Sequence, residues 1–98
     1  MKLGRKAVSD HLVVYLNNTG DQAPFRLGLV VGKTVGNAVE RNLVKRRARS
    51  AIQERMNMLV TGDIIVVRAL PGSAKLPWSG FCEELDQNIN RLKRTQIS

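Results

Sequence analysis

The side chains in this sequence that could do chemistry are mostly basic and gather in one stretch. Seven of the sixteen Lys and Arg residues, but only two of the eight acidic residues, lie between residues 33 and 55. Arginine binds phosphate oxygens in a two-pronged fashion, and asparagine donates to phosphate or reads a base edge. At 100° per residue, a helix would place four of these polar side chains on one arc: Asn42, Lys45, Arg46 and Arg49. The stretch predicts a surface for a nucleic-acid backbone in preference to an ordinary solvated face.

Residues for side-chain catalysis or metal binding are sparse. Cys82 and His11 are the only cysteine and histidine, and they lie far apart in the sequence. This excludes an internal disulfide and argues against a zinc site or a Cys–His nucleophile pair. The acidic residues Glu83, Glu84 and Asp86 are expected on an exposed helical turn rather than around a metal. We expect the chain itself to be non-catalytic and to work in a reducing cytoplasm.

Length and charge narrow the class of protein. The 98 residues, 43% of them hydrophobic, predict one globular domain over residues 1–98. No apolar run approaches the roughly 20 residues of a membrane-spanning helix. The net charge of +8 predicts a polyanionic partner, and an RNA-binding domain is the interpretation that fits best.

The elements that must position the basic stretch begin with two strands. Residues 1–7 are expected to form a basic, flexible start, and residues 8–70 to hold the sheet and its basic helix. Alternation over residues 8–16 predicts a strand with Leu12, Val14 and Leu16 toward the core. Residues 25–31 predict a second strand, which turns its larger apolar side chains to one face.

Helical periodicity follows over residues 37–59, with Asn37 as N-cap and Glu40 completing a capping box. The β-branched run 64–67 predicts a central strand covered on both faces. A last helix is expected over residues 77–94, with Trp78 packing where it begins. The order β-β-α-β-α predicts a two-layer α/β sandwich with one hairpin and one crossover.

The second strand leaves an unusual face opposite the core. That face carries Arg26, Gly28 and Val30, and the first strand adds Val13 and Tyr15 to the same side. Glycines inside a strand mark either a close approach by a ligand or a bulge and crowding from a neighbour. Both interpretations remain open from the sequence alone.

The segment 33–49 reads K-T-V-G-N-A-V-E-R-N-L-V-K-R-R-A-R. It closely resembles the signature of the bacterial ribonuclease P protein subunit, K-x-x-G-x-A-V-x-R-N-x-x-K-R-x-x-R, and matches it at every fixed position. The resemblance extends over roughly residues 4–94. Family members usually have an acidic residue where Ser50 stands here.

The resemblance implies a ribosomal-protein-like α/β sandwich with a left-handed β-α-β crossover around the basic helix. It also implies a subunit of an endoribonuclease in which a catalytic RNA, with magnesium ions held mainly by that RNA, removes the 5′ leader from precursor tRNA. The motif positions implied to contact the RNA subunit are Lys33, Arg41, Asn42, Lys45, Arg46 and Arg49. The leader cleft is implied to contain Val13, Tyr15, Arg26, Gly28 and Val30.

Family members usually have a helix before the first strand, and we expect this chain to lack it. We therefore expect binding of the RNA subunit to be more secure than binding of the leader. No obligate protein partner and no membrane contact are expected. The alternative is a ribosomal or other structural RNA-binding protein without an enzymatic partner.

Overall fold

The computed structural model describes residues 5–96, and it forms a sheet with two long helices. The elements in chain order are β1 (Arg5–Val8), β2 (Leu12–Asn18), β3 (Arg26–Val30), α1 (Ala38–Glu54), β4 (Asp63–Ala69) and α2 (Trp78–Gln96). Three short 3-10 helices join them: η1 (Lys33–Val35), η2 (Met56–Met58) and η3 (Ser73–Lys75).

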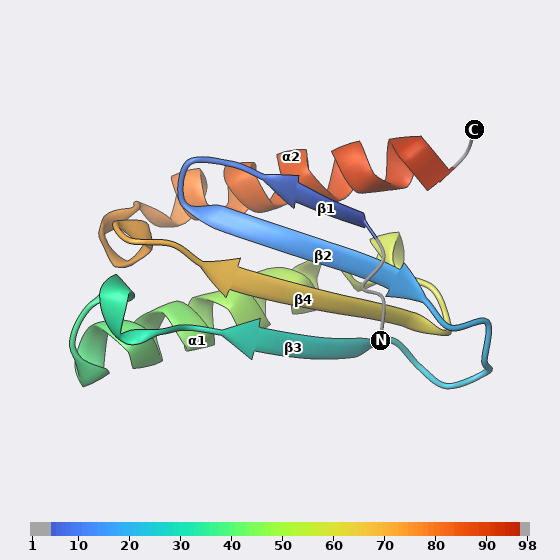
Figure 1. Cartoon of the computed structure of the whole chain (residues 1–98), viewed down its shortest axis with the longest axis horizontal. Coiled ribbons are helices and arrows are strands. Elements are labelled where there is room, and N and C mark those ends of the chain that lie inside the picture. The colour runs from blue at the N-terminus through green and yellow to red at the C-terminus, as the bar shows by residue number, and fades with distance from the viewer. Residues whose placement is uncertain (1–4, 97–98) are drawn as a thin grey trace.

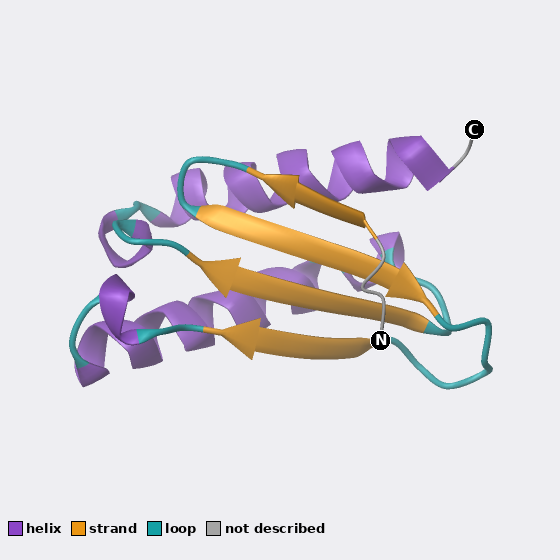
Figure 2. Cartoon of the chain, in the orientation of Figure 1, coloured by secondary structure: helices purple, strands orange, loops and turns teal. Residues whose placement is uncertain are grey.

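The sheet has the strand order β1-β2-β4-β3. β2 pairs antiparallel with β1 and with β4, whereas β3 pairs parallel with β4. Both long helices lie on one side of the sheet (Figures 1 and 2). The connection from β3 through α1 to β4 is consequently left-handed (Figure 1), against the general preference. With β4 in this position, a right-handed connection would have put α1 on the opposite face. The predicted two-layer mixed fold is confirmed.

The core lies between the sheet and the two helices. Leu12, Val14 and Leu16 of β2 are at most 2% exposed, as their alternation predicts. The predicted apolar stripes of both helices are also buried; they comprise Val44, Ala48, Ala51, Ile52, Phe81, Leu85, Ile89 and Leu92. Burying a large apolar side chain contributes about 1.5–3 kcal/mol. This core fixes which face of α1 remains outside.

The N-terminal prediction is wrong for residues 5–11, whereas the strand predicted over residues 12–16 is confirmed. One strand over residues 8–16 was expected after a flexible start, but Arg5–Val8 form β1 and pair with Val13–Leu16 of β2. Ala7 is 3% exposed, so this short strand contributes to the core. Its sequence carries basic residues at Arg5 and Lys6, which hid the alternation. Residues 1–4 of the expected start lie outside the described residues.

Helix α1 begins as predicted and ends earlier. The Asn37 side chain accepts from the Glu40 N–H at 2.9 Å, and the Glu40 carboxylate accepts from the Asn37 N–H at 3.0 Å. This capping box satisfies two N–H groups that the first turn leaves free. The α-helix ends at Glu54 instead of continuing to residue 59, and η2 follows. Leu59 still reaches the core, at 8% exposure.

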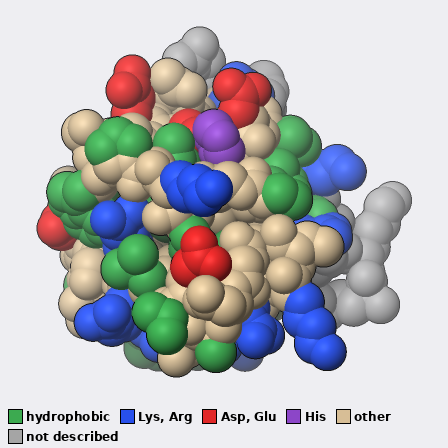
Figure 3. Space-filling view, turned by 90° about the vertical axis from the view of Figure 1, so that its left-hand side faces the viewer, with side chains coloured by type: hydrophobic (Ala, Val, Ile, Leu, Met, Phe, Trp, Pro, Cys, Tyr) green, Lys and Arg blue, Asp and Glu red, His purple; other side chains and the backbone are tan. Residues whose placement is uncertain are grey.

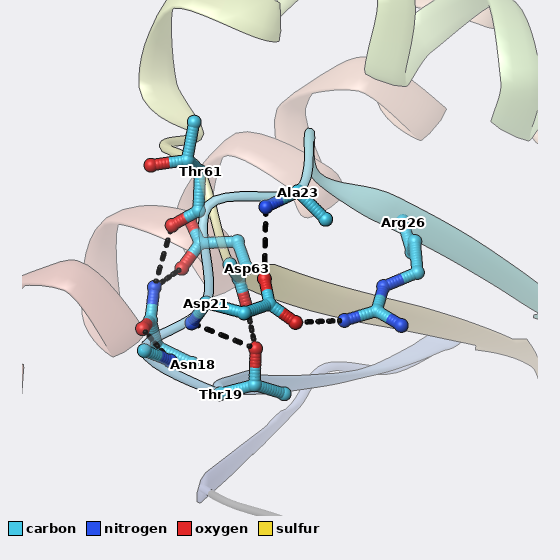
Figure 4. Close-up of polar contacts among 9 residues, drawn as sticks. Asn18, Thr19, Asp21, Ala23, Arg26, Thr61 and Asp63 are labelled. Carbon is cyan, nitrogen blue, oxygen red and sulfur yellow. Dashed lines mark hydrogen bonds and ion pairs between the residues drawn. The ribbon is translucent and has the colours of Figure 1, made fainter.

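A buried carboxylate fastens the start of β4. Asp63 is fully buried and accepts bonds from the Asn18 side chain at 2.8 Å, the Val60 N–H at 3.0 Å and Lys93 at 3.1 Å. Burial alone would raise the pKa of Asp63, but these bonds hold it below its usual 3.8. Figure 4 shows Asn18 joining Asp63 beside the loop of residues 19–25, which connects β2 to β3. This single side chain ties β4 to β2 and to α2.

A second carboxylate fastens the β1–β2 turn to α2. Glu84 accepts from the Ser9 hydroxyl at 2.6 Å, the His11 N–H at 2.9 Å and the His11 ring at 2.7 Å. Asp86, two residues further along α2, pairs with Arg55 of the α1 C-cap. The expectation that these two acidic residues are simply solvated is therefore wrong. Glu83 is exposed, as expected.

Candidate nucleic-acid interface

The outward face of α1 carries a shallow hollow lined by polar and basic side chains. Its lining residues are Val39, Asn42, Lys45, Arg46 and Arg49, which we call the basic surface. The structure thus brings together the four side chains that helical periodicity placed on one arc. Val39 was not predicted to belong to it. This valine is 76% exposed, and its helical spacing, three residues before Asn42 and seven before Arg46, was the available signal in the sequence.

The charges of the basic surface are not neutralised by the protein. Among the described side chains, no ion pair or hydrogen bond engages Lys45, Arg46 or Arg49. Like charges four residues apart on a helix repel each other by a few tenths of a kcal/mol. This repulsion slightly destabilises the free protein, and a bound polyanion would reduce it.

Two other arginines of the same helix region behave differently. Arg47 donates to the Leu76 carbonyl at 2.6 Å and so ties α1 to the segment before α2. Arg55 donates to the Ala51 carbonyl at 2.9 Å and pairs with Asp86. The hydrogen bond with Asp86 raises the pKa of Arg55 above its already high value. These two arginines hold the fold, and neither was among the predicted RNA contacts.

The remaining predicted contacts lie at the start of α1. Lys33 is exposed on η1, and Arg41 is half-buried one turn before Lys45. The Arg41 Nε is buried without a hydrogen-bond partner among the described residues. Neither residue lines the hollow of the basic surface. Figure 3 looks onto the end of the molecule where α1 begins and shows Lys and Arg side chains on several sides of an acidic one.

A second candidate surface is the face of the sheet opposite the helices. The strand register sets Tyr15, Val66 and Gly28 in one cross-strand row. Val13, Arg68 and Val30 form the next row, and Arg26 pairs with Ile64 beside them. All five residues predicted for a cleft therefore share this surface, which we call the open sheet face. The structure brings them together through β4, which lies between β2 and β3.

Gly28 keeps the floor of the open sheet face low. A Cβ at this position would lie 3.3 Å from the Val66 side chain, tighter than most real contacts. The register continues without interruption from Arg26 to Val30, so the strand has no bulge there. Of the interpretations left open by the sequence, crowding from a neighbour is confirmed. Approach by a ligand stays a prediction.

The sequence prediction missed the contribution of β4 and β1 to this face. Ile64 and Val66 are only partly buried and Arg68 is exposed, so β4 is covered by helices on one face and not on both. Uniform β-branched residues conceal such alternation, and Arg68 was the one available signal. Lys6 pairs with Tyr15 in the register and adds a further cation. Arg26 is paired with Asp21 at 3.0 Å, an exposed contact worth little.

The described part of the chain contains neither a cluster of metal ligands nor a membrane-spanning helix. Residues 5–96 bring together no group of three or more His, Cys, Asp or Glu side chains that could hold a metal ion. No helix in that range is long and apolar enough to cross a membrane. The two surfaces can bind a ligand through basic side chains and through the aromatic ring of Tyr15.

Comparison with known proteins identifies relatives of this sequence. The sequence matches the family described as "Ribonuclease P" over residues 1–93. The ribonuclease P protein component of Streptomyces avermitilis is 40% identical over 100 aligned positions, which cover 94% of this chain and 81% of the relative. That of Clavibacter michiganensis is 36% identical, covering 97% and 84%.

Solved structures show the same fold. The RNase P protein of Staphylococcus aureus superimposes with a TM-score of 0.82 at 28% identity, over 92% of this chain and 82% of the other. That of Thermotoga maritima superimposes with a TM-score of 0.75 at 27% identity, over 93% and 83%.

Proposed function

Because the chain belongs to the ribonuclease P protein family, we propose that its two exposed surfaces bind two different RNAs of one enzyme. It is a protein component of ribonuclease P, the enzyme that processes the 5′ end of tRNA. The observation that supports two separate binding roles is the position of the two surfaces in the fold. The basic surface is formed by α1, and the open sheet face is the side of the sheet that α1 and α2 do not cover (Figure 1).

The basic surface is proposed to hold the RNA subunit. Asn42, Lys45, Arg46 and Arg49 line one hollow, and no carboxylate in the described residues competes for these three cations. Lys33 and Arg41 extend this set toward the start of α1. Each phosphate that a cation neutralises releases counterions. Each such contact makes the slope of log binding constant against log salt concentration more negative by about 0.7–0.9. Four or five contacts would then produce a slope of about −3 to −4.5.

The open sheet face is proposed to hold the leader of precursor tRNA. Tyr15 is partly exposed above a floor made of Val66 and Gly28. A base stacked on tyrosine binds regardless of its identity, which suits a leader of variable sequence. Arg26 and Arg68 at the margins would attract the backbone of an extended strand. Val30, 48% exposed, supplies apolar contact in the neighbouring row, whereas Val13 of the same row is only 7% exposed and supports the face from within.

Catalysis is proposed to belong to the RNA subunit, with magnesium ions held mainly by that RNA. The described residues do not fit a magnesium site of their own, since no three carboxylate or imidazole ligands meet. The chain would contribute by binding and orienting RNA. We place this activity in the cytoplasm and infer no obligate protein partner.

The test is cleavage of a precursor tRNA by a bacterial ribonuclease P RNA at low magnesium concentration. Adding this chain should raise the rate strongly, and the chain alone should cleave nothing. Tight binding of the RNA subunit without a rate gain would contradict the role of the open sheet face. Absence of binding would favour a structural RNA-binding protein without an enzymatic partner.

A further inference from the structure

A second hollow lies beside the basic surface, between α1 and the start of α2. It is lined by Leu43, Arg46, Arg47, Ser50, Glu54 and Trp78, and we call it the Trp78 groove. The five α1 residues follow helical spacing and so form one continuous stripe. Arg46 also lines the basic surface, so the two hollows adjoin at this side chain.

Trp78 is held in place and yet remains exposed. Its ring stacks on Phe81 with a centroid separation of 6.2 Å and an angle of 6° between the ring planes. Phe81 is fully buried, whereas Trp78 is 38% exposed. The indole is therefore fixed from below and presents apolar area to solvent. A fixed aromatic ring loses little conformational entropy when a flat ligand stacks on it.

The polar residues of the groove favour one orientation of a ligand. Arg47 is fixed by its bond to the Leu76 carbonyl, whereas Arg46 has no protein partner among the described residues. Glu54 occupies the other end of the stripe; its side chain is 60% exposed, and one carboxylate oxygen lies 3.4 Å from Arg55, which leaves the other oxygen open to a ligand. Glu54 repels a phosphate and Arg46 attracts one. The Glu54 carboxylate can instead accept a hydrogen bond from an N–H group of a base.

We propose that the Trp78 groove binds an unpaired base of the RNA subunit, stacked on the indole, with its phosphate toward Arg46. This inference rests on the proposed function, because it assigns the same RNA to the groove and to the basic surface. The continuity of the two hollows through Arg46 supports one RNA spanning both. The simpler role for Trp78 is to cover Phe81, and that role predicts no change in the indole when RNA binds.

The sequence offers a direct probe, because Trp78 is the only tryptophan. Its fluorescence should be followed while the full chain is titrated with a bacterial ribonuclease P RNA. We expect quenching that saturates with the binding curve, together with protection from acrylamide. Trp78→Ala should weaken RNA binding about 5- to 30-fold, the lower part of the range for one stacked base, and Trp78→Phe should retain most of the affinity.

Met56→Ala is the matched control, because Met56 is an exposed apolar residue outside the groove. It should bind RNA like the unchanged chain. If Trp78→Ala fails to fold, the fluorescence of the unchanged chain and the affinity of Trp78→Phe still decide the question. Normal RNA binding with unaltered Trp78 emission would overturn the groove alone. No binding of the RNA by the unchanged chain would overturn the proposed function, and the groove with it.

Discussion

The basic surface and the open sheet face are built in opposite ways. The basic surface comes from one helix, whose cations project into solvent with no ion-pair partner among the described residues. The open sheet face needs all four strands in register, since its residues come from β1, β2, β4 and β3. Charge is tolerant of position, whereas stacking depends on shape. The first surface should therefore resist small structural changes that damage the second.

The largest effect should come from removing charge at the basic surface. We expect Arg46→Ala combined with Arg49→Ala to weaken binding of the RNA subunit about 100-fold, because each charge-assisted contact is worth roughly tenfold. The log–log salt slope should become shallower by about 1.4–1.8. Titrations at several salt concentrations measure both quantities.

Arg55→Ala is the control for this pair, since Arg55 is held by Asp86 and Ala51. It should lower stability and leave the salt slope unchanged. Equal changes in slope for both variants would break the distinction between free and structural arginines.

The next effect concerns the anchoring of the strands. Asp63→Asn should lower the free energy of unfolding by about 2 kcal/mol at pH 7, because Lys93 and the Val60 N–H lose a charged acceptor. The pKa of Asp63 is lowered by folding, so its contribution is present above about pH 3.8 and disappears as pH falls through the folded-state value.

Urea unfolding at pH 7 and at pH 3 or below tests this prediction. The difference between the two proteins should shrink as the solution becomes more acidic. A difference that is constant with pH would show that Asp63 acts through packing alone.

A smaller effect should separate the two surfaces. Tyr15→Ala should weaken binding of leader-containing precursor tRNA about 5- to 30-fold and spare binding of the RNA subunit. Tyr15→Phe retains the ring and should bind both RNAs almost normally. A mature tRNA without a leader serves as the second reference. Equal losses on both RNAs would contradict the assignment of one surface to each.

The smallest effect should come from the floor of the open sheet face. Gly28→Ala adds a Cβ 3.3 Å from the Val66 side chain, so a neighbour must shift slightly. We expect about a twofold loss in leader binding, and stability within about 0.5 kcal/mol, because alanine also restricts the unfolded chain. Electrophoretic or fluorescence titration measures the first quantity and urea unfolding the second. A gain in leader affinity would show that the floor is not in contact with the leader.

Local patterns predicted most of the helix layer. The spacing of Val44, Ala48 and Ile52 identified the buried side of α1, and that choice left the cations outside. The Asn37–Glu40 capping box placed the start of the helix correctly. These features succeed because they depend on residues within a few turns of one another.

The sheet layer was harder to predict, because its faces are set by contacts between distant segments. Residues 64–67 are all β-branched, so no alternation distinguishes the covered face of β4 from the open one. The sequence around Glu84 predicts a solvated side chain, because the β1–β2 turn whose Ser9 and His11 donate to it lies more than 70 residues away in the chain. Sequence patterns describe a strand or a helix well, but they do not say which element lies across from it.

The left-handed link through α1 has a consequence for the order in which the protein assembles. β1 and β2 are joined by a short turn, but β3 finds its partner β4 only after residues 31–62 have been traversed. Closing a longer loop costs more entropy, so parallel pairing across a helix forms slowly. β3 also lies at the sheet edge, with a glycine at its centre. Its amide hydrogens should be the first in the sheet to exchange with deuterated water, so the part of the open sheet face that contains Gly28 would also be the part most readily remodelled.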